Sequence, residues 1–342
     1  MPPGSFFMKK CNQRNSGIGG QAVLEGVMMR NGEDYAVAVR RSDGSITVKK
    51  EKYKGFFADS PLKKIPFIRG IFVFIDSMVL GLRCTDYSAS IYAQDDPDEA
   101  DKDTGSDQAK ESEESALEKF LMAAVMVFSF ALAIGLFMVL PYFIASRLIN
   151  LIGNANLLSV FEGVIRIAIF VIYILLISMM KDIRRLFQYH GAEHKCINCL
   201  ENGHELTVEN AAKATRLHKR CGSSFILFVM MVSIVLFFFI RVRNPIARVG
   251  IRILLLPVIS GISYELIRFA GSSDNPLIAL LSKPGLWLQG LTTKEPDEEM
   301  IAVAIESVNA VFDWRAYLEK EFGTEYAGEK EAEASCTAAA GS

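Results

Sequence analysis

Long stretches without charge alternate with strongly charged stretches along this chain. Four apolar segments stand out, at residues 120–146, 157–180, 222–240 and 249–270. Each is about as long as the roughly 20 residues that a helix needs to cross the hydrocarbon core of a bilayer. In the second segment, Glu162 and Arg166 are four positions apart, so one can neutralise the other on a helix face. The pattern therefore predicts four membrane-spanning helices.

Residues 65–82 form a further apolar stretch, which Arg69, Gly70, Asp76 and Gly81 interrupt. We interpret it as a helix lying in the membrane interface rather than as a fifth span. Residues 35–41 and 45–53 alternate apolar and polar positions around Ser42-Asp43-Gly44, which predicts a β-hairpin.

After the fourth span, residues 276–291 are expected to form an interfacial helix anchored by Trp287. Pro296 and the carboxylates that follow it are typical of a helix start, and an apolar period continues to Phe312. The predicted fold is mainly α: a polytopic membrane helical bundle with a small cytoplasmic amino-terminal α+β cap containing the hairpin. Its parts are a cytoplasmic region (1–92), an acidic disordered linker (93–117), the membrane domain (118–275) with a cytoplasmic motif loop (181–221), carboxyl-terminal helices (276–326) and a disordered tail (327–342).

Charge refines this picture, although the composition by itself looks ordinary: the 342 residues are 51% hydrophobic and 22% charged, with a net charge of -2. These values exclude disordered, collagen-like and disulfide-stapled classes. Lysine and arginine are in excess in residues 1–83 and 181–221, so the positive-inside rule predicts cytoplasmic termini and a multi-pass protein of the bacterial cell membrane. Arg241, Arg243 and Arg248, on the predicted outer side, oppose this orientation. Nothing in the sequence supports a nucleic-acid partner, and it leaves oligomerisation open.

The candidate chemistry begins with Tyr189-His190-Gly191-Ala192-Glu193-His194-Lys195. His190 and His194 share one face of a helix that would continue from the second span, so their imidazoles can hold one ion. Glu193 lies beside them as a candidate general base toward a water molecule. The pattern H-x-x-E-H is that of inverted zincins, which predicts a divalent metal ion, zinc above all. The alternative is a polar helix end at the membrane surface.

Two further groups can complete such a site. His218 and Cys221, three apart before the third span, can converge on one metal ion. Glu265 is a carboxylate inside the fourth span at the same predicted depth, and it is either a third ligand or an ion-pair partner of Arg268. A rival set combines Cys196 and Cys199 with His218 and Cys221 in a closed, structural zinc site.

The amino-terminal sequence 16–30 contains glycines that favour a tight turn or a close approach to the bundle. Its partial match to a dinucleotide fingerprint lacks the strand and the βαβ unit that such a motif needs. Glu25 and Arg30 are interpreted either as facing the cytoplasmic site or as a local surface pair.

Several of these segments together resemble the YqhQ-like family of uncharacterised bacterial membrane proteins. The motifs are GGQAVLEGVMMR (19–30), YHGAEHK (189–195), LTVENA (206–211), LHKRCGSSF (217–225) and GLWLQGLTTKEPDEEMI (285–301). The resemblance implies a metal-dependent enzyme and places five residues in recurring motifs, namely His190, Glu193, His194, His218 and Cys221. Cys196 lies outside that pattern, which disfavours the structural zinc site. Lys219 and Ser223 stand where related members often have proline and threonine, and neither is a candidate ligand.

The sequence thus predicts a metal-dependent membrane enzyme, hydrolytic in type, with a lipid-linked or membrane-protein substrate. Two other classes stay open. One is a scaffold or assembly factor with a structural zinc site. The other is a transporter that uses Glu265, Glu162 and Arg166, which the lack of a repeat or broken-helix pair disfavours.

Overall fold

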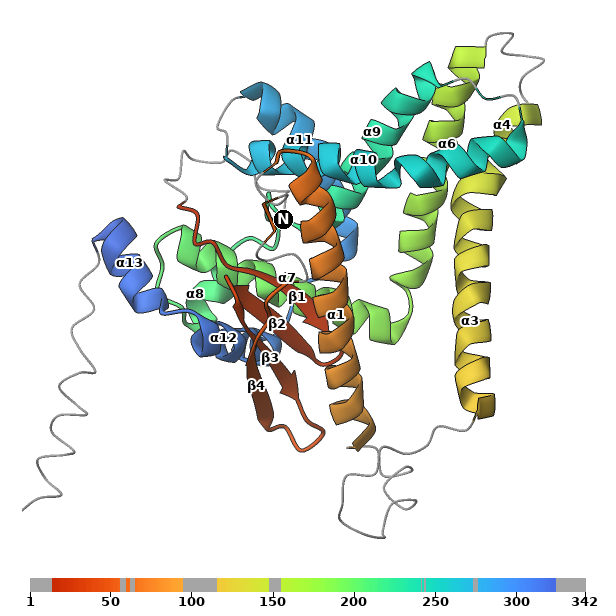
Figure 1. Cartoon of the computed structure of the whole chain (residues 1–342). Coiled ribbons are helices and arrows are strands. Elements are labelled where there is room, and N and C mark those ends of the chain that lie inside the picture. Colours follow the sequence, from red (N-terminus) through yellow and green to blue (C-terminus); the bar gives the residue numbers. More distant parts are fainter. Residues whose placement is uncertain are drawn as a thin grey trace, which may run out of the picture.

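The computed structural model describes residues 14–55, 60–61, 65–94, 116–147, 155–240, 242, 244–272 and 276–323. Within these ranges the chain is mostly helical, with one antiparallel sheet in its amino-terminal part (Figure 1). Residues 95–115 of the predicted acidic linker and the whole predicted tail lie outside the described residues.

The sheet has four strands in the order β1-β2-β3-β4, with bounds Gly19–Val23, Gly26–Asn31, Asp34–Arg40 and Ile46–Lys52. Strands β3 and β4 form the predicted hairpin, with Arg40 paired to Ile46. The first two strands were not predicted. Gly32 was a usable signal for the β2–β3 turn, because a two-residue hairpin loop favours glycine at its first position, and Gly32 has a φ of 63° there.

Alternate residues of the sheet face two different helical layers, as the two-residue period of a strand requires. Val27, Met29, Ala36 and Ala38 pack in one core with α7 (Lys181–Glu201) and α12 (Glu298–Val311). On the other face, Val23, Met28, Tyr35, Val37 and Val39 pack with Leu80, Cys84 and Ile91 of α1 (Ile68–Gln94). The sheet is therefore sandwiched, with α1 on one side and α7 and α12 on the other (Figure 1).

Helix α1 covers residues 68–82 of the predicted interfacial segment and continues twelve residues beyond it, from Arg83 to Gln94. It lies against α10 (Pro245–Ser272), where Gly70 allows close approach, since a Cβ there would lie 2.7 Å from the Cβ of Tyr264. The ion pair between Arg69 and Glu265 joins the same two helices.

Four helices are long and apolar enough to cross a membrane, at Ala124–Arg147, Leu157–Ile177, Gly222–Phe239 and Val249–Ala270. These agree with the four predicted spans. The first combines α3 (Ala116–Ile134), the π-helical turn η2 (Gly135–Val139) and α4 (Leu140–Arg147); the others lie in α6 (Ala155–Ile177), α9 (Gly222–Phe239) and α10.

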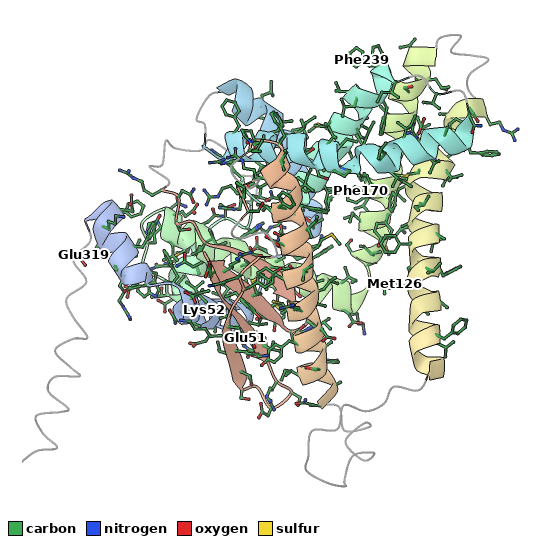
Figure 2. All side chains as sticks on the ribbon, viewed as in Figure 1. Glu51, Lys52, Met126, Phe170, Phe239 and Glu319 are labelled. Carbon is green, nitrogen blue, oxygen red and sulfur yellow. The ribbon has the colours of Figure 1, made fainter. Side chains whose placement is uncertain are left out.

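The four helices pack less closely than a bundle. Phe170 of α6, Leu227 of α9 and Leu288 of α11 (Pro276–Thr292) share a core. In the first candidate span, however, 6% of the apolar window is buried, and the large apolar side chains that the structure describes in α3, such as Met126, are exposed (Figure 2). Figure 1 shows α3 standing apart and α10 running across α6 and α9.

The predicted carboxyl-terminal helices are present. Asp297 caps α12 by accepting a 2.7 Å hydrogen bond from the backbone N–H of Met300. Two short helices were not predicted, α8 (Val208–Lys213) and α13 (Trp314–Phe322), which ends at Gly323 in the left-handed conformation.

Candidate metal centre

Helix α7 places the H-x-x-E-H motif in the protein interior. It is a separate helix rather than a continuation of α6, because the chain turns at residues 178–180. From Gly191 to Glu201 every residue is buried, against the sheet and α12. Position 191 needs glycine because the segment after α11 packs closely against it. A Cβ at this position would overlap the carbonyl oxygen of Lys294. This contact brings that segment alongside His190.

Three side chains converge from α7 and from the start of α9. One ring nitrogen each of His190 and His194 and the sulfur of Cys221 all lie within 4.8 Å of one another, so the group can hold a metal ion. The Nε2 of His190 is 3.2 Å from the Cys221 Sγ, and the two imidazole centroids are 4.5 Å apart. The described residues contain one such group of three or more His, Cys, Asp or Glu side chains.

Both imidazoles are oriented by backbone carbonyls. The Nδ1 of His190 lies 3.0 Å from the carbonyl oxygen of Thr292, and the Nδ1 of His194 lies 2.6 Å from that of Arg216. A carbonyl oxygen accepts, so each Nδ1 carries a proton, and each Nε2 can offer a lone pair to a metal ion once it has no proton of its own. Metal-binding histidines are held in this way by groups around the site.

The three side chains also adjust each other's charge. Burial lowers the pKa of His190, but the negative charges of Cys221 and then Glu193 outweigh it and raise that pKa to about 9. Burial raises the pKa of the Cys221 thiol, but His194 and His190 outweigh it and hold that pKa well below its ordinary value. This effect favours the thiolate, the form of cysteine that binds metal ions.

Glu193 is near this group without belonging to it. Its side chain is buried, and a Cβ added at Gly20 of β1 would lie 3.0 Å from its carboxyl carbon. The backbone N–H of Gly20 donates to the carboxylate. Burial raises the pKa of Glu193, and the two imidazoles partly oppose this effect. A carboxyl group with a raised pKa beside a cation site has the properties of a general base.

His218 lies next to the group but meets a different partner. Its ring centroid is 5.7 Å from that of His194, and its Nε2 is 3.4 Å from the Oε2 of Glu201. Arg220 donates to the same carboxylate, and the backbone N–H and the Oγ of Ser16 donate to it at 2.9 and 2.8 Å. Of the two residues that the sequence offered together to complete the site of His190 and His194, the structure places Cys221 in the group and His218 beside it, on Glu201.

Two other predicted arrangements are not present. Glu265 is bound by Arg69, which donates from Nε at 2.6 Å, so its carboxylate lies outside the group. The Cys196 thiol points to the carbonyl of Ile301, and Cys199 donates 3.3 Å to the carbonyl of Glu205. Burial raises the pKa of both thiols, that of Cys199 to about 12. The four-ligand zinc set of two cysteines, His218 and Cys221 is thus not assembled.

The remaining motif residues surround the site. Glu25, at the β1–β2 turn with a φ of 49°, accepts hydrogen bonds from Arg185 at 2.5 Å and from the Tyr189 hydroxyl at 3.2 Å, and so holds α7 to the sheet. Arg30 donates instead to the carbonyl of Gly32, away from α7. The Lys195 ammonium donates 2.8 Å to the Ala212 carbonyl and pairs with Glu295.

Glu201 and Gln289 are buried residues that the sequence analysis did not select. Gln289 accepts from the backbone N–H of His218 at 2.8 Å and donates to its carbonyl at 2.7 Å, which fixes the segment that leads to Cys221. Gln289 lies in the segment GLWLQG, and Glu201 lies in the segment CLENG. For Gln289, a single polar residue after an apolar run was the available signal, whereas Glu201 stands beside Asn202 and has no such signal.

Comparison with known proteins gives a family without an assigned activity. A family model described as a protein of unknown function (DUF1385) matches residues 65–314. The chain is 41% identical over 308 residues to the uncharacterized protein YqhQ of Bacillus subtilis (strain 168), covering 88% of this chain and 94% of that protein. No solved structure matches. The match covers α7, α9 and all three convergent side chains, and it confirms the expected resemblance: the chain belongs to the DUF1385 family.

Proposed function

We propose that this protein is a metal-dependent membrane enzyme whose ion is held by His190, His194 and Cys221. The observation that supports this most is the convergence of the three ligand atoms within 4.8 Å, while the Nδ1 of each imidazole is bound to a backbone carbonyl. An imidazole fixed in this way offers its Nε2 in one direction without a further loss of rotamer freedom.

The donor set fits zinc better than magnesium or calcium, which take oxygen ligands. Two nitrogens and one thiolate fill three positions of a tetrahedral ion and leave the fourth open, which is the arrangement of catalytic zinc sites. A structural site would close with a fourth protein ligand, and the thiols of Cys196 and Cys199 are bound elsewhere. This distribution favours the enzyme over the scaffold.

The proposed reaction is hydrolysis, with Glu193 as the general base. A divalent ion at the three ligands would supply Lewis acidity. Glu193 is held beside them by the Gly20 backbone, and burial raises its pKa, which makes the carboxylate a stronger base. Because Cys221 directly precedes a candidate span, the substrate we propose is lipid-linked or a membrane protein, reached from the cytoplasmic side.

Metal analysis of the purified full-length protein tests this proposal. We expect about one zinc per chain in the wild type and a large loss in His190→Ala, His194→Ala and Cys221→Ser. Matched controls are His204→Ala, an exposed histidine of the same segment, and Cys199→Ala, a buried cysteine outside the group. Unchanged metal content in all three ligand variants would refute the centre, and loss in Cys199→Ala but not His190→Ala would favour the scaffold.

A further inference from the structure

Glu162, Arg166 and Arg252 meet among the apolar helices, at the opposite end of α9 from Cys221. Their side chains are 1%, 11% and 6% exposed. Glu162 and Arg166 lie on α6, Arg252 lies on α10, and the ring of Phe237 near the end of α9 packs against both guanidinium groups at 6.0 and 4.8 Å. Cys221 and Phe237 are separated by about 24 Å along the helix. This cluster is thus distinct from the candidate metal centre.

The contacts within the cluster are those of a shared carboxylate. Arg252 donates from both terminal nitrogens to Glu162, with its Nη2 2.8 Å from Oε2. Arg166 donates from Nη2 to Oε1 at 3.2 Å, from Nε to the Phe137 carbonyl at 2.9 Å and from Nη1 to the Ser233 hydroxyl at 3.3 Å. Arg166 is therefore fully engaged by protein groups.

The cluster carries more positive than negative charge. Two guanidinium groups share one carboxylate, which leaves a formal charge of +1 in an apolar environment. Glu265 is the other carboxylate in the sequences of α6, α9 and α10, and Arg69 binds it. An uncompensated buried charge is strongly unfavourable, so charged residues among membrane helices mark functional sites by default.

The contacts with Glu162 do not use the Nε donor of Arg252. Within the described part of the chain, its buried Nε has no hydrogen-bond partner. The side chain lines a small cavity, which has room for about one water-sized group and is bounded by Ser159, Phe237, Ile240, Val242, Ile251 and Arg252. One negatively charged oxygen in this cavity would lie against the Arg252 side chain and neutralise the excess charge.

We propose that this cluster binds a phosphoryl oxyanion, either the headgroup phosphate of an anionic lipid or free inorganic phosphate. Although Glu162 occupies the guanidinium fork of Arg252, the cluster keeps an excess positive charge, and arginine forms strong charge-assisted hydrogen bonds with phosphate oxygens. Glu162 lies five residues after Leu157, where the candidate span begins, or about 8 Å along the helix, a depth near that of lipid headgroups. In the sequence, Arg241 and Arg243 directly follow α9, and an anionic lipid would also account for basic residues on the predicted outer side.

Native mass spectrometry of the full chain in a neutral detergent tests this proposal. The probes are short-chain phosphatidylglycerol, zwitterionic phosphatidylcholine and inorganic phosphate. We expect retention of phosphatidylglycerol over phosphatidylcholine, and a decrease of about ten- to a hundredfold in Arg252→Gln, the scale of one charge-assisted hydrogen bond. Arg268→Gln, which alters an exposed arginine of the same helix, should bind as the wild type does.

Glu162→Gln separates this role from a merely structural one. It raises the formal charge of the cluster from +1 to +2, so anion binding should become tighter even though the helices lose an ion pair. If Arg252→Gln does not fold, the double variant Glu162→Gln/Arg252→Gln replaces it, because it leaves no carboxylate with a missing partner and still lacks the guanidinium fork.

The three probes distinguish the possible outcomes. Retention of the anionic lipid alone identifies a headgroup site, and retention of inorganic phosphate as well identifies a general phosphate site. Equal retention of both lipids with no phosphate bound would overturn the proposal. Weaker anion binding in Glu162→Gln would overturn it too, since it would show an ion pair with a packing role. None of these results depends on metal at His190, so the two proposals fail separately.

Discussion

Replacing Glu201 by glutamine removes the negative charge to which Ser16, His218 and Arg220 are bound, and its effect can be worked out from the structure. Burial raises the pKa of Glu201, but the hydrogen bond with His218 and the charge of Arg220 outweigh it and lower that pKa from 4.5 to about 2. This difference corresponds to about 3 kcal/mol of folding free energy. The side chain is 1% exposed, so solvent screening reduces this value little.

The pH dependence has a definite sign. Because the folded-state pKa is lower than the unfolded one, the contribution of Glu201 is complete well above pH 4.5 and is lost as the pH falls toward 2. About half should remain at pH 3. We therefore expect the unfolding free energy of Glu201→Gln to be about 3 kcal/mol below that of the wild type at pH 7, and the gap to narrow on acidification.

Denaturant unfolding in detergent, followed by tryptophan fluorescence at pH 7, 5 and 3 (conditions chosen to bracket about 4.5), measures this gap. Comparing wild type and variant at each pH cancels the protonation of groups that do not contact Glu201, such as His190 and Cys221. Glu306→Gln, an exposed glutamate of α12, is the matched control and should change stability little at any pH. A gap that stays constant from pH 7 to pH 3 would refute the electrostatic reasoning.

Three further predictions follow from the candidate site. In Gly20→Ala, the new Cβ would lie 2.6 Å from the Met28 carbonyl and 3.0 Å from the Glu193 carboxyl carbon, so we expect a loss of about 1–3 kcal/mol in denaturant unfolding; unchanged stability would contradict this packing. Cobalt-substituted protein should show a thiolate-to-metal charge-transfer band that is absent in Cys221→Ser, and a band that persists would exclude this ligand. Glu193→Gln should keep its metal content, while the pH midpoint of its visible cobalt spectrum shifts; loss of the metal would make Glu193 a ligand instead of a base.

Periodicity was enough to predict the four apolar helices, the β3–β4 hairpin and the two histidines of α7, because each of these depends on neighbours within a few positions. The contact of Cys221 with His190, in contrast, does not depend on neighbouring positions. Cys221 lies 31 positions after His190, and their contact follows from how α9 docks beside α7, which no local pattern encodes. The sequence offered His218 and Cys221 together as residues that complete the site of His190 and His194; Cys221 joins those histidines, whereas His218 meets Glu201.

Strands β1 and β2 were missed for a related reason. Met28 and Met29 are both buried, because each face of the sheet is covered by helices, so the strand shows a continuous apolar run instead of an alternation. The partner of Glu265 was missed because it is distant in the sequence. A carboxylate inside an apolar helix predicts a partner, but Arg69 lies 196 positions away, in a segment that was predicted as a separate element.

The distribution of the three ligands over two helices has a mechanical consequence. His190 and His194 belong to α7, which is packed against the sheet, whereas Cys221 is the residue from which α9 enters the apolar helices. An ion bound to all three would cross-link these two parts of the protein. Its occupancy and the docking of α9 on α7 are then thermodynamically linked, so whatever shifts α9 along its axis also changes the affinity for the ion. Removal of the ion should loosen this junction before either part unfolds.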